Sequence, residues 1–334
     1  MNDHKLYDPS VDYVRYPTFA PMPLPYFRCT GCGSTDFGLL LPRYQLRCKR
    51  CGLTPDVPLA VELPMQPPLP QIQICEGYFH TVILRPDGTV RAVGENRYGQ
   101  CNVEDWSGIT AITAGFQHTL GLRADGTVCA VGDRSYGQCN TENWTDVTAI
   151  AAGDFHSVGL CAIGTVLADG TADYGPCNVK NWSRITAIAA GAYHSVALRA
   201  DGTVRSEGQN QYGRCNVWDW SDIIAIAAGE SHTVGLQSDG IVRAVGWNEY
   251  GQCKVEGWTD MTAIAAGYFH TVGLRKDGTV RAVGSNEYGQ CNVTDWTDVA
   301  AIWALRAYTV AIRKDGTLLC TDPEKLKWLR EALA

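Results

Sequence analysis

One spacing governs most of this chain: the same residues return every 38 positions from Gln71 onward. A cysteine, a histidine and a tryptophan each keep this interval through six copies, with no insertion between copies. The recurring positions are Cys101, Cys139, Cys177, Cys215, Cys253 and Cys291; His80, His118, His156, His194, His232 and His270, with Tyr308 in the seventh place; and Trp106, Trp144, Trp182, Trp220, Trp258 and Trp296. A fixed period of this size is typical of a solenoid or a propeller.

Each copy reads as a set of short strands. In copy six, residues 261–298, the segments TAIAAG, HTVGL, TVRAV and QCNV are separated by glycines and turn pairs. The Asp277-Gly278 pair predicts a hairpin turn between the second and third segments. Four strands of about five residues, with short connections, fill one period. We therefore predict an all-β fold: a seven-bladed β-propeller of 38-residue, four-stranded repeats over residues 71–321.

The repeated motif also resembles a known family. The pattern G-x-x-H-[TS]-x-x-L-x-x-D-G-T-V, followed by V-G-x-N-x-Y-G-Q, is similar to the repeat of the regulator of chromosome condensation family. That resemblance implies a seven-bladed β-propeller. The copies are shorter than those of the eukaryotic members, and cysteine stands where those repeats carry leucine after Gly-Gln, so they look more like the compact bacterial versions.

The strictly repeated side chains are interpreted as structural. Equivalent side chains of neighbouring blades lie too far apart to converge on one metal ion or to form disulfides. We expect each histidine to bond backbone at a blade junction, each cysteine to be a small buried apolar residue, and each tryptophan to pack between blades.

The links that differ between copies are the candidate partner-binding surface. The link before the histidine and the link before Tyr-Gly each follow an odd-numbered strand, which places both on one face of the ring. Aromatic and charged side chains on such loops are typical of a protein-binding surface. The predicted contacts are Tyr78, Phe79, Arg97, Phe116, Arg134, Phe155, Tyr193, Trp247, Tyr268 and Phe269, with the unique Trp218 as a further candidate. The alternative is that these aromatic residues fill the central channel.

Two C-x-x-C pairs near the N-terminus predict a zinc ribbon over residues 26–54. Four thiolates in this pattern form a closed tetrahedral site for one structural zinc ion, with iron or redox chemistry as the alternative. The ligands are Cys29, Cys32, Cys48 and Cys51. The ribbon is locally basic, so weak nucleic-acid contact is a second hypothesis, beside a merely solvated surface. Its candidate contacts are Arg43, Arg47, Lys49 and Arg50.

Proline content and the irregular seventh copy indicate how the remaining segments of the chain are organised. Residues 1–25 and 55–70 are proline-rich, and the second of these predicts a semi-rigid linker. Copy seven has no Tyr-Gly-Gln-Cys segment; instead, Asp322 and Pro323 predict the start of a C-terminal helix over residues 322–334. That helix would cover the open edge of the last blade, unless residues 57–63 supply the missing strand.

Composition restricts the function. The net charge of -7 argues against the propeller as a nucleic-acid binder, and no run approaches the length of a membrane span. The sequence lacks a phosphate loop and a unique catalytic constellation, so we expect a cytoplasmic, non-enzymatic interaction scaffold whose propeller is monomeric and binds a protein partner. Two alternatives stay open: a guanine-nucleotide exchange factor, which the family resemblance implies, and a nucleic-acid-associated subunit that uses the ribbon.

Overall fold

The computed structural model describes residues 37–40, 45–48, 72–171, 173 and 175–333 of the 334-residue chain. The chain divides into two compact units, one of Pro21–Leu69 and one of Met1–Ala20 with Pro70–Ala334. We call the described part of the larger unit, residues 72–333, the repeat unit. In the described part of the chain, no helix is long and apolar enough to span a membrane.

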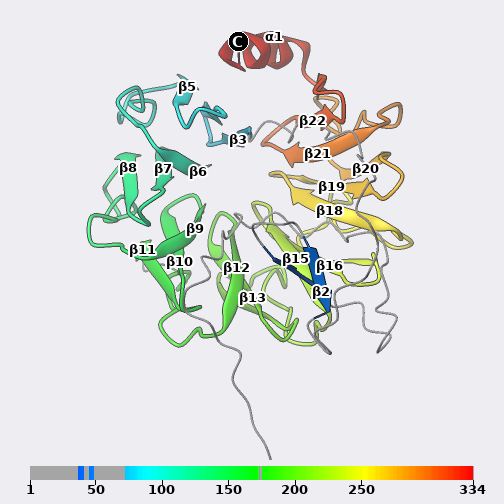
Figure 1. The fold of residues 1–334 in the computed structure, drawn as a ribbon, viewed down its shortest axis with the longest axis horizontal. Helices are drawn as coiled ribbons and strands as arrows, with labels where there is room; N and C mark the ends of the chain where they lie inside the picture. Colours follow the sequence, from blue (N-terminus) through cyan, green and yellow to red (C-terminus); the bar gives the residue numbers. More distant parts are fainter. Residues whose placement is uncertain (1–36, 41–44, 49–71, 172, 174, 334) are drawn as a thin grey trace, which may run out of the picture. The chain divides into compact units, whose positions relative to one another are not determined.

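The repeat unit consists of seven antiparallel sheets of three strands each, one sheet per copy. Figure 1 shows the sheets following one another around a common centre. The strands are β3 (Gln73–Glu76), β4 (His80–Leu84) and β5 (Val90–Gly94); β6 (Ile109–Ala114), β7 (His118–Arg123) and β8 (Val128–Gly132); β9 (Val147–Ala152), β10 (His156–Cys161) and β11 (Val166–Gly170); β12 (Ile185–Ala190), β13 (His194–Arg199) and β14 (Val204–Gly208); β15 (Ile223–Ala228), β16 (His232–Gln237) and β17 (Val242–Gly246); β18 (Met261–Ala266), β19 (His270–Arg275) and β20 (Val280–Gly284); and β21 (Val299–Ala304), β22 (Thr309–Arg313) and β23 (Leu318–Cys320).

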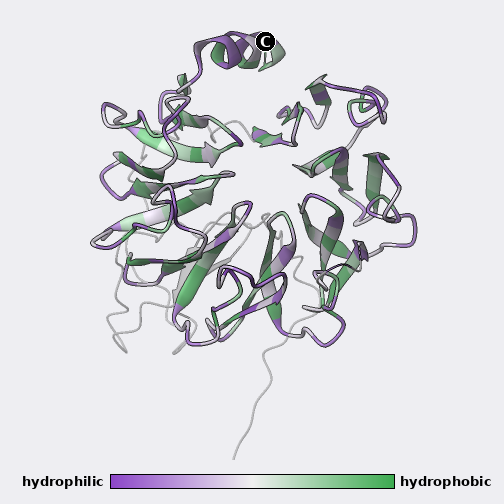
Figure 2. Cartoon of the chain, turned by 180° about the vertical axis from the view of Figure 1, so that it is seen from behind, coloured by the Kyte–Doolittle hydropathy of each residue, from purple (hydrophilic) through white to green (hydrophobic). Residues whose placement is uncertain are grey.

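The middle strand of each sheet is the most buried element. In β7, every residue from His118 to Leu122 is buried, because neighbouring sheets cover both of its faces. Such a strand has no solvent-exposed side, so its sequence shows no alternation of polar and apolar residues. Figure 2 shows the resulting pattern, with hydrophobic residues on the strands and hydrophilic residues in the connections.

The prediction of a fourth strand in each copy is wrong. In copy one the segment after β5 forms consecutive turns, in which Asn102 N donates to Gly99 O and Trp106 N donates to Val103 O. The side chain of Asn96 also accepts a hydrogen bond from the amide of Cys101 at 2.8 Å. These local bonds satisfy the backbone that a strand would offer to its neighbour, so the segment ends as a compact loop.

A tryptophan takes the place of that strand in packing. Trp106 lies against Gly121 in the next sheet, where an added Cβ would meet its ring at 2.6 Å. The later copies have glycine or alanine at the same position, and Trp144, Trp182, Trp220 and Trp258 are buried in the cores between sheets. The prediction that the tryptophans pack between sheets is confirmed for these residues.

The first and last sheets meet at a seam of different composition. No tryptophan of the described residues precedes the first sheet, and Ile83 occupies the position of Gly121. Ile83 packs in one cluster with Val310, Ile312 and Leu329. Leu329 belongs to helix α1 (Pro323–Leu333), which Asp322 caps by accepting hydrogen bonds from the amides of Glu324 and Lys325. In the part of the chain that the structure describes, no strand of the first sheet pairs with the last, so side chains and α1 hold this seam.

Of the smaller unit, the structure describes a two-stranded antiparallel hairpin. Strand β1 (Phe37–Leu40) pairs with β2 (Gln45–Cys48), with Phe37 opposite Cys48. This hairpin lies in the sequence between the two C-x-x-C pairs.

Candidate functional site

The repeated histidines connect each sheet to the next. Nε2 of His80 lies 2.8 Å from the hydroxyl of Thr119, and Nε2 of His118 lies 3.0 Å from the hydroxyl of Ser157. Thr119 in turn donates to the carbonyl oxygen of Gln100 at 2.8 Å. Because the hydroxyl has only one proton, the imidazole must be the donor, which fixes its proton on Nε2. The expectation of a histidine–backbone bond is therefore corrected: a hydroxyl of the next copy stands between the histidine and the backbone.

These histidines are neutral. Burial lowers the pKa of His80, His156 and His270 to about 4, and that of His118 and His232 to about 3. The glycine three residues before each histidine leaves room for the ring, because a Cβ at Gly77 would overlap Cε1 of His80 and the carbonyl oxygen of Gly115. Buried, uncharged and bonded in this way, the histidines are unavailable for acid–base chemistry.

The repeated cysteines are free thiols of low reactivity. Cys101, Cys139 and Cys253 are buried, and the other three are half-buried. The Sγ of Cys139 lies 3.2 Å from the carbonyl oxygen of Asp133, and Cys101, Cys215, Cys253 and Cys291 have the same contact in their own copies. Burial raises the pKa of Cys101 and Cys139 to about 11, so their reactive thiolate form is scarce at neutral pH.

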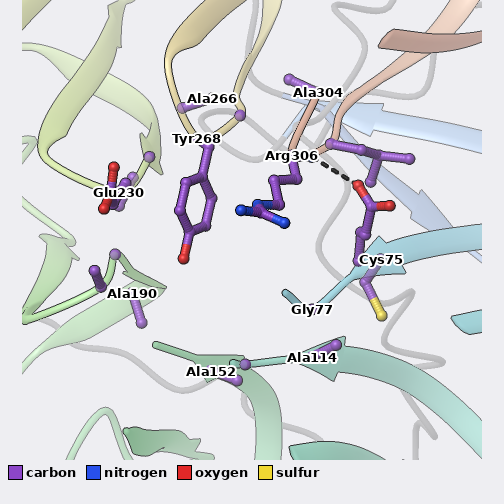
Figure 3. Close-up of a pocket in the computed structure, with 18 of the residues that line it drawn as sticks. Cys75, Gly77, Ala114, Ala152, Ala190, Glu230, Ala266, Tyr268, Ala304 and Arg306 are labelled. Carbon is purple, nitrogen blue, oxygen red and sulfur yellow. Dashed lines mark hydrogen bonds between the residues drawn. The ribbon is translucent and has the colours of Figure 1, made fainter. Parts of the chain in front are cut away.

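The links before the histidines are divided between the centre and one face of the repeat unit. Except for Phe116, the first residue of each pair lines a central cavity. Tyr78, Asp154, Glu230, Tyr268 and Arg306 line a cavity of about 250 Å³ whose walls are mostly alanine and glycine. Figure 3 shows this cavity, with Tyr268 between Glu230 and Arg306 in that view. Two of the predicted contact residues, Tyr78 and Tyr268, therefore line the central cavity, which agrees with the alternative interpretation for these two.

Two contacts cross the mouth of the cavity. The hydroxyl of Tyr268 donates to the carboxylate of Asp154, three copies away, with both oxygens at 3.1 Å. The guanidinium carbon of Arg306 lies 3.3 Å from the ring centre of Tyr78, and Nη1 donates to Tyr78 O at 2.8 Å. The repeat symmetry is therefore broken here, although the surrounding strands are nearly identical.

Of the three carboxyl groups that line the cavity, Glu76 pairs with Lys325, whereas Asp154 and Glu230 lack a close counter-charge. Among the described residues, neither Asp154 nor Glu230 forms an ion pair within 4.0 Å. Burial raises the pKa of Asp154 to about 6, while burial and the neighbouring Asp154 raise the pKa of Glu230 to about 7. Sequence reasoning gave no signal for this pair, because the two residues are 76 positions apart and only the ring brings them together.

Four of the second residues, Phe79, Phe155, Tyr193 and Phe269, belong to an aromatic surface. Antiparallel pairing places His80 opposite Gly94, so the links before β4 and after β5 lie at the same end of the sheet. Each ring of this surface lies within 6.2 Å of a neighbour, from Tyr193 through Phe155, Phe116, Tyr78, Tyr268, Phe269 and Trp247 to Tyr212. We call the connected set the aromatic arc: Tyr78, Phe79, Phe116, Tyr136, Phe155, Tyr193, Tyr212, Trp247, Tyr250, Tyr268 and Phe269.

The most exposed members of the arc include tyrosines that the sequence did not single out. Tyr136, Tyr212 and Tyr250 are about half exposed, as is Phe79. This tyrosine recurs in most copies, and its ring points outward. The loop is held by its own side chains: Gln252 Oε1 accepts from the amide of Tyr250, and Asn248 Oδ1 accepts from the amide of Cys253. A tyrosine on a loop fixed in this way loses little conformational freedom on binding.

The remaining predicted contacts are peripheral. Arg97 is exposed and lies over the ring of Tyr98 at 5.8 Å. Arg134 is exposed and pairs with Glu142 at 3.1 Å, a surface ion pair of little energetic weight. Trp218 is 85% exposed and belongs to the loop that follows the Tyr212 turn.

Most of the predicted zinc and nucleic-acid residues lie outside the described residues. Cys29, Cys32, Cys51, Arg43, Lys49 and Arg50 belong to this group. Cys48 and Arg47 lie on β2. The zinc site and the nucleic-acid contacts therefore stay predictions.

Comparison with known proteins agrees with the resemblance drawn from the motif. The model of the regulator of chromosome condensation (RCC1) repeat matches residues 72–100, 109–138, 185–214, 223–252 and 261–290. The chain carries RCC1 repeats. Its two unmatched copies are the irregular third and seventh, where Ile163 replaces the turn aspartate and Tyr308 replaces the histidine.

Solved structures similar to this RCC1-repeat chain share its fold. The ectodomain of the receptor kinase CR4 from Physcomitrella patens is 20% identical, with a TM-score of 0.60 over 75% of this chain and 72% of that one. Prp20p from Saccharomyces cerevisiae is 16% identical, with a TM-score of 0.59 over 78% and 85%. Human WBSCR16 is 18% identical, with a TM-score of 0.58 over 72% and 86%. No curated protein sequence matches the chain significantly.

Proposed function

We propose that this protein is a non-enzymatic interaction scaffold that binds a protein partner on the aromatic arc. The observation that carries the proposal is the continuity of the arc: aromatic side chains from six copies meet ring to ring on one face. Exposed aromatic clusters of this kind supply the anchors of protein interfaces. The prearranged loops beneath them favour binding without a large loss of entropy.

The test is a quantitative capture experiment with the full chain. A variant that combines Phe79→Ala, Tyr136→Ala and Tyr250→Ala removes three exposed rings and is expected to lose most of its specific partners. The control is Ile163→Ala, since Ile163 is 84% exposed in the turn at the other end of β10. If the triple variant recovers the same partners in the same amounts as the control, the arc is not the partner surface.

Guanine-nucleotide exchange is a second candidate. It is favoured by the likeness to Prp20p, described as binding Gsp1p and histones. The strict 38-residue spacing provides no inserted segment between strands of the repeat unit, which weakens this candidate. Fold likeness alone does not carry function. Nucleotide release from small GTPases of the same organism decides between the two: acceleration supports exchange, and unchanged release removes it.

We also propose that the N-terminal four-cysteine segment is a structural zinc ribbon and provides a second contact, either to protein or to nucleic acid. The antiparallel β1–β2 hairpin between the two cysteine pairs, with Cys48 at its end, fits a ribbon. Purified full chain is expected to contain one zinc per molecule, and Cys48→Ser to lose it. Nucleic-acid contact through the ribbon predicts salt-dependent binding that disappears when Arg43, Arg47, Lys49 and Arg50 are replaced by glutamine.

A further inference from the structure

The cavity mouth beside the aromatic arc has an unusual charge arrangement. Three acidic residues line it, and only Glu76 has an ion-pair partner, Lys325, whereas Asp154 and Glu230 have none among the described residues. Arg306 lies on the opposite side, and its guanidinium contacts the ring and the carbonyl oxygen of Tyr78. Arg214 lies behind Glu230 and donates to its backbone oxygen at 3.5 Å, not to its carboxylate. The carboxylates therefore keep acceptor capacity toward the cavity.

Hydrogen bonding shows which of the two acids is free. Asp154 accepts from the hydroxyl of Tyr268 with both oxygens. The side chain of Glu230 accepts no hydrogen bond from any described residue and is half-buried in the cavity wall. A half-buried carboxylate without a donor is costly, and a guest that brings a positive charge and N–H donors would relieve that cost.

The surroundings of the carboxylates favour a guanidinium as that guest. Tyr78 and Tyr268 belong both to the arc and to the cavity wall, with ring centres 6.0 Å apart. A guanidinium stacks on aromatic faces, is weakly hydrated, and can donate to two acceptors at once, whereas an ammonium is compact and strongly hydrated. The protein already uses this chemistry once, since its own Arg306 lies over Tyr78 and, at 5.2 Å, over Tyr268.

We propose that the partner bound on the aromatic arc inserts an arginine side chain into the cavity mouth, where its guanidinium pairs with Glu230 and Asp154. The proposal rests on the arc being the partner surface, and it identifies the chemistry of the partner. The partner's segment is expected to present one arginine between apolar residues, because apolar neighbours suit the rings of the arc.

The experiment uses a fluorescent probe peptide, Gly-Leu-Arg-Leu-Gly with blocked ends, and the full chain. Matched peptides replace the arginine with citrulline, its uncharged isostere, or with lysine. We expect the arginine peptide to bind at least about tenfold more tightly than either. Glu230→Gln is expected to remove that preference, while Glu249→Gln and Glu287→Gln, on exposed loops of the same face, keep it.

Acidity provides an independent readout. The charged or titratable groups around the two carboxyls are Cys75, Glu76, Tyr78, Tyr268 and Arg306 of the cavity wall, and Arg214 behind Glu230. Since the pKa values of Asp154 and Glu230 are about 6 and about 7, both groups are charged at pH 8 and become protonated toward pH 5.5. Affinity for the arginine peptide should therefore fall over that range, whereas the citrulline peptide should show no such fall.

Several results would overturn the proposal: no binding of the arginine peptide, equal binding of citrulline or lysine peptides, or an unchanged arginine preference in folded Glu230→Gln. Asp154→Asn, which keeps the shape of the side chain, serves as a second variant if Glu230→Gln unfolds. The arc is tested separately by the triple variant at Phe79, Tyr136 and Tyr250. Partner capture that depends on the arc but not on Glu230 would reject the arginine site while leaving the proposed function intact.

Discussion

Each of the repeated histidines depends on one hydroxyl group in the following copy. His80 donates to Thr119, and Thr119 donates to the carbonyl oxygen of Gln100, so a single buried side chain joins two sheets and one loop. Four copies use threonine and two use serine for this purpose. The hydroxyl, rather than the methyl group, is what these positions share.

Replacing that hydroxyl is expected to destabilise the repeat unit. Thr119→Val has nearly the same shape but leaves the N–H of His80 and the carbonyl of Gln100 without partners, at a cost of about 2–3 kcal/mol. Thr119→Ser keeps the hydroxyl and should cost less than about 1 kcal/mol. Urea unfolding measures both, and equal stability of the two variants would refute the role of the hydroxyl.

Acid is expected to unfold the repeat unit for the same reason. The folded pKa values of five histidines, about 3 to 4, lie below the ordinary value of 6.5, and burial also lowers the pKa of His194, so the unfolded chain binds more protons in between. Stability is complete above pH 6.5 and falls toward pH 4, by about 2 kcal/mol per histidine at pH 5. The raised pKa values of Glu76, Asp154, Asp169 and Glu230 act in the opposite direction, but these four carboxyl groups oppose six histidines. Unfolding free energies that stay constant between pH 7 and 5 would contradict this prediction.

Repetition in the sequence revealed the structural role of these histidines but not their partner. The hydroxyl belongs to the residue 39 positions after the histidine in the sequence. This pairing can be recognised only when the packing of successive sheets is known. The same limit explains the tyrosines of the arc. Tyr136 and Tyr250 recur in the Tyr-Gly motif, and the sequence does not show that their rings are exposed.

At the scale of single elements, strands were easier to predict than loops. Glycine positions and apolar runs located three strands of every copy, because those segments have no local alternative to sheet pairing. The QCNV segment has such an alternative, since Asn96, Gly99 and Asn102 satisfy its backbone through local hydrogen bonds. The segment therefore forms turns, although its composition is similar to that of a strand. The Asp322-Pro323 start of α1, by contrast, needs only local signals.

Helix α1 is expected to hold the seam between the first and last sheets. Leu329 is fully buried against Ile83 and Val310, and Arg85 donates to the carbonyl oxygen of Ala332 at 2.7 Å. Leu329→Ala should lower the unfolding free energy by about 3 kcal/mol, whereas Lys327→Ala on the exposed side should change it by less than about 0.5 kcal/mol. Hydrogen exchange of β3, β4, β21 and β22 should accelerate in the Leu329 variant first. Equal effects of the two substitutions would show that α1 is dispensable for the seam.

At the scale of the whole molecule, the seven sheets repeat almost symmetrically, whereas the side chains of the central cavity and of the aromatic arc differ from copy to copy. The sheets repeat closely, but the side chains around the cavity are Tyr78, Asp154, Ala192, Glu230, Tyr268 and Arg306. The sequence indicated which links vary and that they share one end of the sheets. It could not separate the residues that enter the cavity from those on the arc, because that distinction depends on the geometry of the ring.

The most direct test of the arc as partner surface is hydroxyl-radical footprinting of the full chain, free and in complex with a captured partner. Oxidation of the exposed rings Phe79, Tyr136, Tyr212 and Tyr250 is expected to fall several-fold on binding, while Ile163 at the opposite end of its sheet stays equally reactive. Protection of Ile163 and its neighbouring turns, with unchanged oxidation of the arc, would contradict the account.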